Sequence, residues 1–113
     1  EQRERMSGDA MSGALVHPGL GPADEMTEYL WNLHVAAVAA DNPGLDAWPP
    51  VGGRGWMHFS LLPLLGMLIG ELWYLEELAA DCANDGVYEF MLTSAPLNLP
   101  GGVGSPPNAL AIK

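Results

Sequence analysis

An apolar run with an ionisable residue at each end is the part of this sequence best suited to chemistry. Residues 56–70 carry no carboxylate, lysine or arginine; His58 lies near the start of the run, and Glu71 follows its last residue. Burying an ionisable group costs free energy unless something pairs with it, so both side chains need a polar partner. A metal ion or a polar catalytic pocket would be such a partner. The alternative is a structural His58 whose ring is satisfied by hydrogen bonds.

Proline and glycine divide this run into a short helix and a strand. Pro63 is tolerated only in the first turn of a helix, and Gly66 is suited to end the helix in the left-handed conformation. We therefore predict a helix that begins at His58, a break at Gly66, and a strand over 67–70 with Glu71 at its exit. In one continuous helix, thirteen residues at ~100° each would place the two ionisable side chains on different faces. The break allows them to meet.

A helix followed directly by a strand is predicted ahead of this run. Asp24 can cap a helix over 24–34, and four apolar side chains in it repeat with helical spacing: Met26, Tyr29, Leu30 and Leu33. The uninterrupted run Val-Ala-Ala-Val-Ala-Ala, residues 35–40, favours a buried central strand. Polar groups at the carboxyl end of such a strand often line a site, which makes Asp41 and Asn42 candidates for a substrate pocket. The alternative is an Asx turn that ends the strand.

The C-terminal third is predicted to hold one more helix and two strands. The helix covers 75–85, has an apolar stripe that includes Cys82, and is closed by Gly86. Cys82 has no histidine beside it in sequence and is interpreted as a small core residue. Strands are expected over 87–93 and 108–112, joined by a loop rich in proline and glycine.

Composition restricts the classes of function. Of the 113 residues, 49% are hydrophobic. The chain has 4 basic and 14 acidic residues, which gives a net charge of −10. Such a chain folds as one domain, and its charge argues against binding to nucleic acid. A single cysteine excludes an internal disulfide, and the apolar run is too short to cross a bilayer. We therefore expect a cytoplasmic protein with no membrane or nucleic-acid partner.

Three segments carry a family resemblance. The stretch from Gly19 to Lys113 resembles the C-terminal half of the cyclase family of metal-dependent hydrolases, which includes kynurenine formamidase (arylformamidase) and isatin hydrolase. The matching segments are Val-Ala-Ala-Val-Ala-Ala-Asp-Asn at 35–42, His58 with Leu-Leu at 61–62 and Gly-Met-Leu-Ile-Gly-Glu-Leu at 66–72, and the Pro/Gly-rich stretch 95–111.

The resemblance implies an α/β fold of the swivelling β/β/α type and one or two bound Zn²⁺ or Mn²⁺ ions. In the family, the histidine and glutamate of this motif contribute to the metal centre or its proton relay, a role that carries over to His58 and Glu71 as both metal ligands and catalytic residues. The implied reaction is attack of a metal-bound hydroxide on the amide, formamide or lactam carbonyl of a small-molecule substrate. A homo-oligomer is expected for the full-length form.

One departure from the family pattern concerns the metal. The principal metal motif of the family, His-x-Gly-Thr-His-x-Asp, does not occur in this chain. We therefore expect 19–113 to be the C-terminal part of one hydrolase domain, which is inactive as this fragment because it lacks metal ligands. Residues 1–18, ahead of that part, are expected to be irregular. The competing hypothesis is a non-catalytic α/β binding or assembly module, in which His58 and Glu71 are merely hydrogen-bonded.

Overall fold

The computed structural model describes residues 16–21, 24–50 and 56–113, which fall into two compact units divided between Trp73 and Tyr74. We describe each unit by itself. Within these described ranges, no helix is long and apolar enough to cross a membrane. Most of the segment predicted to be irregular, 1–18, lies outside them.

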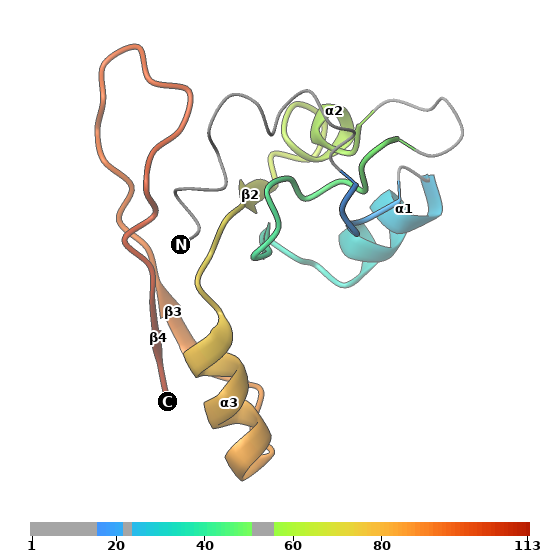
Figure 1. Ribbon diagram of the computed structural model, residues 1–113. Helices are drawn as coiled ribbons and strands as arrows, with labels where there is room; N and C mark the ends of the chain where they lie inside the picture. The colour runs from blue at the N-terminus through green and yellow to red at the C-terminus, as the bar shows by residue number, and fades with distance from the viewer. Residues whose placement is uncertain (1–15, 22–23, 51–55) are drawn as a thin grey trace. The chain divides into compact units, whose positions relative to one another are not determined.

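Within its described residues, the first unit holds two helices and two strands, close to where the sequence predicts them (Figure 1). They are α1 (Asp24–Asn32), β1 (Ala37–Ala39), α2 (His58–Leu61) and β2 (Leu68–Gly70). The α1 helix ends earlier than predicted, because His34 takes a left-handed backbone conformation with φ 57°.

The two strands form a parallel pair, with Ala37 opposite Leu68, Val38 opposite Ile69 and Ala39 opposite Gly70. The prediction of a strand within 35–40 is confirmed, but the prediction that it is buried is wrong. In β1 only Val38 is half-buried, and both alanines are exposed. Among the described residues β1 has a single strand neighbour, β2, so its other edge and much of its surface stay open.

An apolar core holds the first unit together. Its buried members come from α1, α2 and the segments beside them: Leu30, Leu45, Met57, Leu61 and Met67. Of the predicted stripe on α1, Leu30 is buried, whereas Tyr29 and Leu33 are more than half exposed. Because Met57 and Leu61 are both buried, the core holds the first turn of α2, and His58 with it.

The predicted break between α2 and β2 is confirmed. Gly66 has φ 65°, and its N–H donates to the Leu62 carbonyl at 3.2 Å. The next N–H, on Met67, donates to the Leu61 carbonyl at 2.9 Å, which closes the turn after α2 and leads the chain into β2. Glu71 then follows the last residue of that strand.

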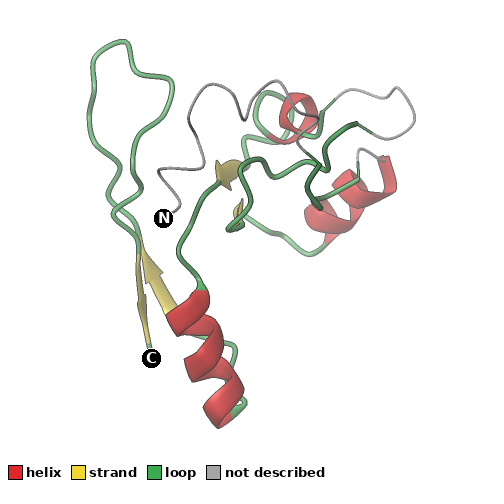
Figure 2. Ribbon diagram, viewed as in Figure 1, coloured by secondary structure: helices red, strands yellow, loops and turns green. Residues whose placement is uncertain are grey.

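The second unit consists of a helix and a hairpin (Figure 2). Helix α3 (Glu76–Asp85) ends at Gly86, which has φ 71°, as predicted. Strands β3 (Met91–Thr93) and β4 (Leu110–Ile112) are antiparallel and shorter than predicted. Cys82 is buried, in agreement with its interpretation as a core residue, and it is the one buried residue of this unit.

Candidate functional site

His58 lies between two carboxylates. Its Nε2 is 3.1 Å from Glu71 Oε1, and its Nδ1 contacts Asp46 Oδ2 on the other side of the ring. The side chains of His58 and Glu71 are 24% and 31% exposed, so solvent and small molecules can reach them. The two residues at the ends of the apolar run therefore meet, as the helix-break-strand prediction required.

Asp46 is the member of this site that the sequence did not reveal. It is a buried carboxylate, 7% exposed, and its second oxygen, Oδ1, accepts a hydrogen bond from the Met57 backbone N–H. Asp46 lies in an irregular proline- and glycine-rich segment, where no periodicity marks a buried position. The available signal was that it is the only acidic residue between Leu45 and Gly55.

Backbone contacts hold Asp46 and Glu71 in place. The Leu45 N–H donates to Glu71 Oε1 at 2.7 Å, so the residue before Asp46 is fastened to the same carboxylate that meets His58. A neighbouring segment packs against Asp46: a Cβ placed on Gly19 would lie 2.4 Å from the Asp46 carbonyl carbon. Only glycine permits this close approach of two backbones.

This arrangement can store and transfer a proton. Ionised carboxylates only accept hydrogen bonds, so each ring nitrogen of His58 must carry a hydrogen to bond its carboxylate. Both hydrogen bonds therefore exist at the same time only when the ring carries two hydrogens. When the ring is neutral, the hydrogen that remains can lie toward Asp46 or toward Glu71. An imidazole oriented by a buried carboxylate is the usual arrangement of a histidine that acts as a general acid or base.

The donor set has the right chemistry for Zn²⁺ or Mn²⁺ but is incomplete. Imidazole and carboxylate both suit these ions, and a carboxylate such as Asp46 commonly orients a ligating histidine. Among the described residues, however, no group of three or more histidine, cysteine or acidic side chains could hold a metal ion. Catalytic zinc sites use three protein ligands. His58 and Glu71 therefore do not form such a site without further ligands.

The two predicted pocket residues lie apart from this cluster. Asp41 is exposed on the surface after β1. Asn42 makes two hydrogen bonds to other segments. Its Nδ2 donates to the Pro18 carbonyl at 2.6 Å, and its backbone carbonyl accepts the Leu72 N–H at 2.9 Å. A role for either residue in a substrate pocket stays a prediction.

Two tryptophan rings pack against each other, and one of them also meets the His58 ring. The rings of Trp48 and Trp56 meet edge to face with centroids 5.4 Å apart, and Trp56 lies 5.8 Å from the His58 ring in a similar geometry. Edge-to-face contacts of this kind add to the stability of the segment that carries Asp46.

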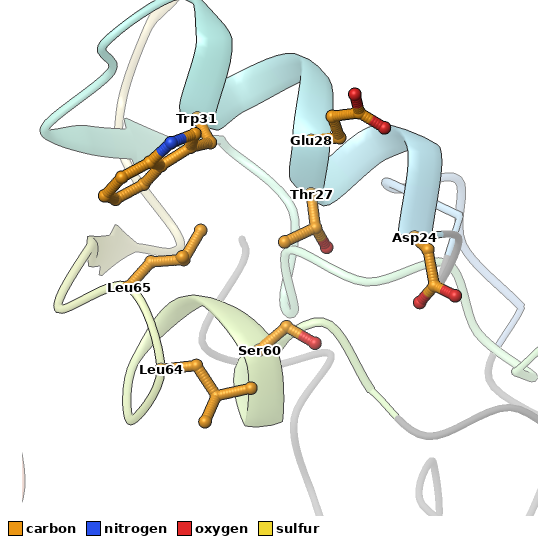
Figure 3. A pocket seen from close by; sticks show the side chains of 7 residues that line it. All are labelled: Asp24, Thr27, Glu28, Trp31, Ser60, Leu64 and Leu65. Atoms are coloured by element: carbon orange, nitrogen blue, oxygen red, sulfur yellow. The ribbon is translucent and has the colours of Figure 1, made fainter.

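A separate pocket lies between α1 and α2 (Figure 3). The Trp31 ring and Leu65 form one end, and Thr27 and Ser60 face each other across it. None of the predicted site residues lines this pocket.

Comparison with known proteins finds similarity to a solved structure. Neither a scan against family models nor a search of curated proteins finds a match. Among solved structures, the chain is similar to the crystal structure of a novel cyclase, with 46% sequence identity and a TM-score of 0.68. The match covers 82% of this chain and 30% of that cyclase. The chain thus spans less than a third of that cyclase.

The fold class agrees with this similarity. The described residues form a mixed α/β structure with small sheets, as the sequence predicted, and it matches part of the solved cyclase. This likeness supports the cyclase family for the chain.

Proposed function

We propose that this chain forms the His58–Glu71 part of the active site in a cyclase-family hydrolase that acts on an amide, formamide or lactam carbonyl. The observation that carries the proposal is the position of His58 between Asp46 and Glu71. Asp46 orients the ring, and His58 exchanges a proton at Nε2 with Glu71 or with the substrate. The hydrolase class and the carbonyl substrate come from the family resemblance.

The metal belongs to this proposal only as an incomplete site. His58 and Glu71 are two ligands of suitable chemistry, and the others have to come from outside the described residues. We therefore expect this chain to bind Zn²⁺ or Mn²⁺ weakly. Dialysis against metal-free buffer followed by elemental analysis should leave far less than one ion per chain. Retention of one zinc ion per chain would contradict the incomplete-site interpretation.

The catalytic role is tested by substitution in the longest form of the protein that can be expressed. His58→Ala and Glu71→Ala should each lower the rate of formate release from an aryl formamide by ~100-fold or more, the usual effect of removing a general acid or base. His34→Asn is the matched control, because His34 is exposed and asparagine tolerates its left-handed backbone. Full activity in both alanine variants would refute the proposal.

A second candidate function is a binding or assembly module. The observation in its favour is the β3–β4 hairpin, whose large apolar residues Met91, Leu92, Leu110 and Ile112 are between 46% and 63% exposed. Exposed apolar surface of this kind is typical of a contact with another chain. Sedimentation of the chain at high concentration tests this function: we expect a dimer or larger assembly, whereas a single monomeric species would count against it.

A further inference from the structure

The pocket between α1 and α2 is a second site of the first unit, apart from His58. Its volume is about 460 Å³. Cavities that hold small organic molecules measure roughly 300–1,000 Å³, so this one has the right size for such a ligand. Leu30 of α1 and Leu61 of α2 both belong to the apolar core, which keeps the two walls of the pocket together.

One face of α1 supplies both the charge and the aromatic ring of the pocket. The α1 residues that line it follow one another at helical spacing, which places them on one side of the helix: Asp24, Thr27, Glu28 and Trp31. Carboxylates four residues apart on a helix repel each other, so a cation beside Asp24 and Glu28 would be stabilising. The positive end of the α1 dipole offsets only part of this charge, because it amounts to about half an elementary charge.

The two ends of the pocket differ in polarity. The Trp31 ring and Leu65 form the apolar end, and Asp24 lies at the opposite end (Figure 3). Between them Thr27 and Ser60 face each other, and their hydroxyl oxygens can accept hydrogen bonds from a ligand. Trp31 is 57% exposed, so a ligand can reach its ring.

We propose that this pocket binds a small amphiphilic organic ammonium ion. Its ammonium group lies beside the carboxylates of Asp24 and Glu28, and its apolar body packs against the Trp31 ring. Carboxylates form strong charge-assisted hydrogen bonds with an ammonium group, and the face of an indole ring attracts a nearby cation. The net charge of −10 favours a cationic ligand further.

The size and polarity of the pocket distinguish this ligand from other classes. An anion of the same shape would meet two carboxylates, and a neutral molecule would gain nothing from them. A lysine side chain of another protein carries the charge but has no apolar body to fill the end at Trp31. The pocket shares no lining residue with the His58 site, so this inference goes beyond the proposed function and does not depend on it.

Titration of the present chain with three compounds tests the inference. They are 2-phenylethylamine, which is protonated at neutral pH, its neutral analogue 2-phenylethanol, and N-acetyl-lysine amide, which presents a lysine side chain. Binding is followed through the backbone amide signals of Thr27 and Ser60 in ¹H–¹⁵N spectra. The amine should bind with a Kd of about 1 mM, as expected for a ligand of its size, and the other two compounds at least about tenfold more weakly.

Three outcomes of the titration would overturn the inference. The first is that the amine shifts neither signal at about 10 mM, which is well above the expected Kd. The second is equal binding of the amine and the alcohol, because the carboxylates would then play no part. The third is equally tight binding of the lysine derivative, which would assign the pocket to a side chain of another protein.

Two variants separate the charge from the ring. Glu28→Gln and Trp31→Leu should each lower the preference for the amine over the alcohol, measured as the ratio of the two Kd values, by about threefold or more. Glu25→Gln is the matched control: it removes the same charge from α1 at a residue that does not line the pocket, and it should keep the ratio. All three residues are exposed, so these variants should fold. The same ratio in Glu28→Gln and Glu25→Gln would overturn the inference.

Discussion

The two units of the chain are stabilised in different ways. Among its described residues, the first unit buries five apolar side chains in one cluster and places the His58 site beside them. In the second unit Cys82 is the one buried residue, and the exposed hairpin residues add little burial. Polar contacts hold its parts together instead: the Lys113 ammonium bonds Asp81 at 2.9 Å and Asp85 at 2.8 Å, both on α3, and the Val87 carbonyl at 3.0 Å.

This difference explains where a precise site can form. An imidazole held between two carboxylates needs neighbours that cannot shift, and a packed core provides them because it is dense and resists deformation. Exposed ion pairs contribute little stability and are screened by salt. We therefore expect substitutions in the first unit to have large effects on folding and on the site, and substitutions in the second unit to have small ones.

The largest effect is expected in the core of the first unit. Leu61 is fully buried, so Leu61→Ala should lower the free energy of unfolding by about 2–5 kcal/mol. The control in the second unit is Leu110→Ala at a position that is 63% exposed, and its effect should stay within about 0.5 kcal/mol. Urea denaturation measures both. Equal losses of unfolding free energy in the two variants would show that the two units do not differ in how much they depend on a packed core.

The next effect concerns the buried carboxylate of the site. Asp46→Ala leaves the Met57 N–H and the His58 ring without their acceptor, which should cost about 3 kcal/mol of unfolding free energy. Asp41→Ala is the control, because Asp41 is exposed. If Asp46→Ala unfolded at the same urea concentration as the control, Asp46 would not be a structural partner of His58.

A smaller effect is expected where two backbones touch. The close approach of Gly19 to Asp46 leaves no room for a methyl group, so Gly19→Ala should lower the unfolding free energy by about 1–3 kcal/mol. Gly21→Ala is the matched control, because the same substitution there adds a Cβ that has no atom within 4 Å. Thermal unfolding of the two variants compares them, and an equally stable pair would disprove the contact.

The smallest effect is expected in the second unit, and it depends on pH. The hydrogen bond from Lys113 lowers the pKa of Asp85 below its ordinary value of 3.8, and the pKa of Lys113 is raised by the hydrogen bonds that its ammonium donates to Asp81 and Asp85. A carboxylate with a lowered pKa stabilises the folded state above its ordinary pKa, and this stabilisation is lost as the pH falls through the lowered value.

Lys113→Met should therefore remove part of the acid dependence of the second unit. Helical signal and amide protection around Gly86, compared near neutral pH and well below 3.8, should fall less on acidification in Lys113→Met than in the unsubstituted chain. Lys113→Arg keeps the charge and should retain the acid dependence. The same loss on acidification in all three chains would contradict the role of this ion pair.

Local signals explain which parts of the fold were predictable. Gly86 ends α3 in the left-handed conformation, and Gly66 takes the same conformation at the break between α2 and β2; both positions were predicted because glycine adopts this conformation at little cost. The break at Gly66 also placed His58 and Glu71 correctly. The burial of residues 35–40 was predicted wrongly, because an alanine-rich run shows that a strand can be buried and not which neighbours cover it.

Residue order along the chain thus decided where α2 begins, where the break before β2 lies, and that His58 and Glu71 stand at the two ends of this segment, since proline, glycine and apolar spacing act over a few neighbouring residues. Tertiary structure alone brought in Asp46. It lies in an irregular segment, and its place beside His58 depends on hydrogen bonds and core packing between residues far apart in the chain, which no short-range pattern encodes.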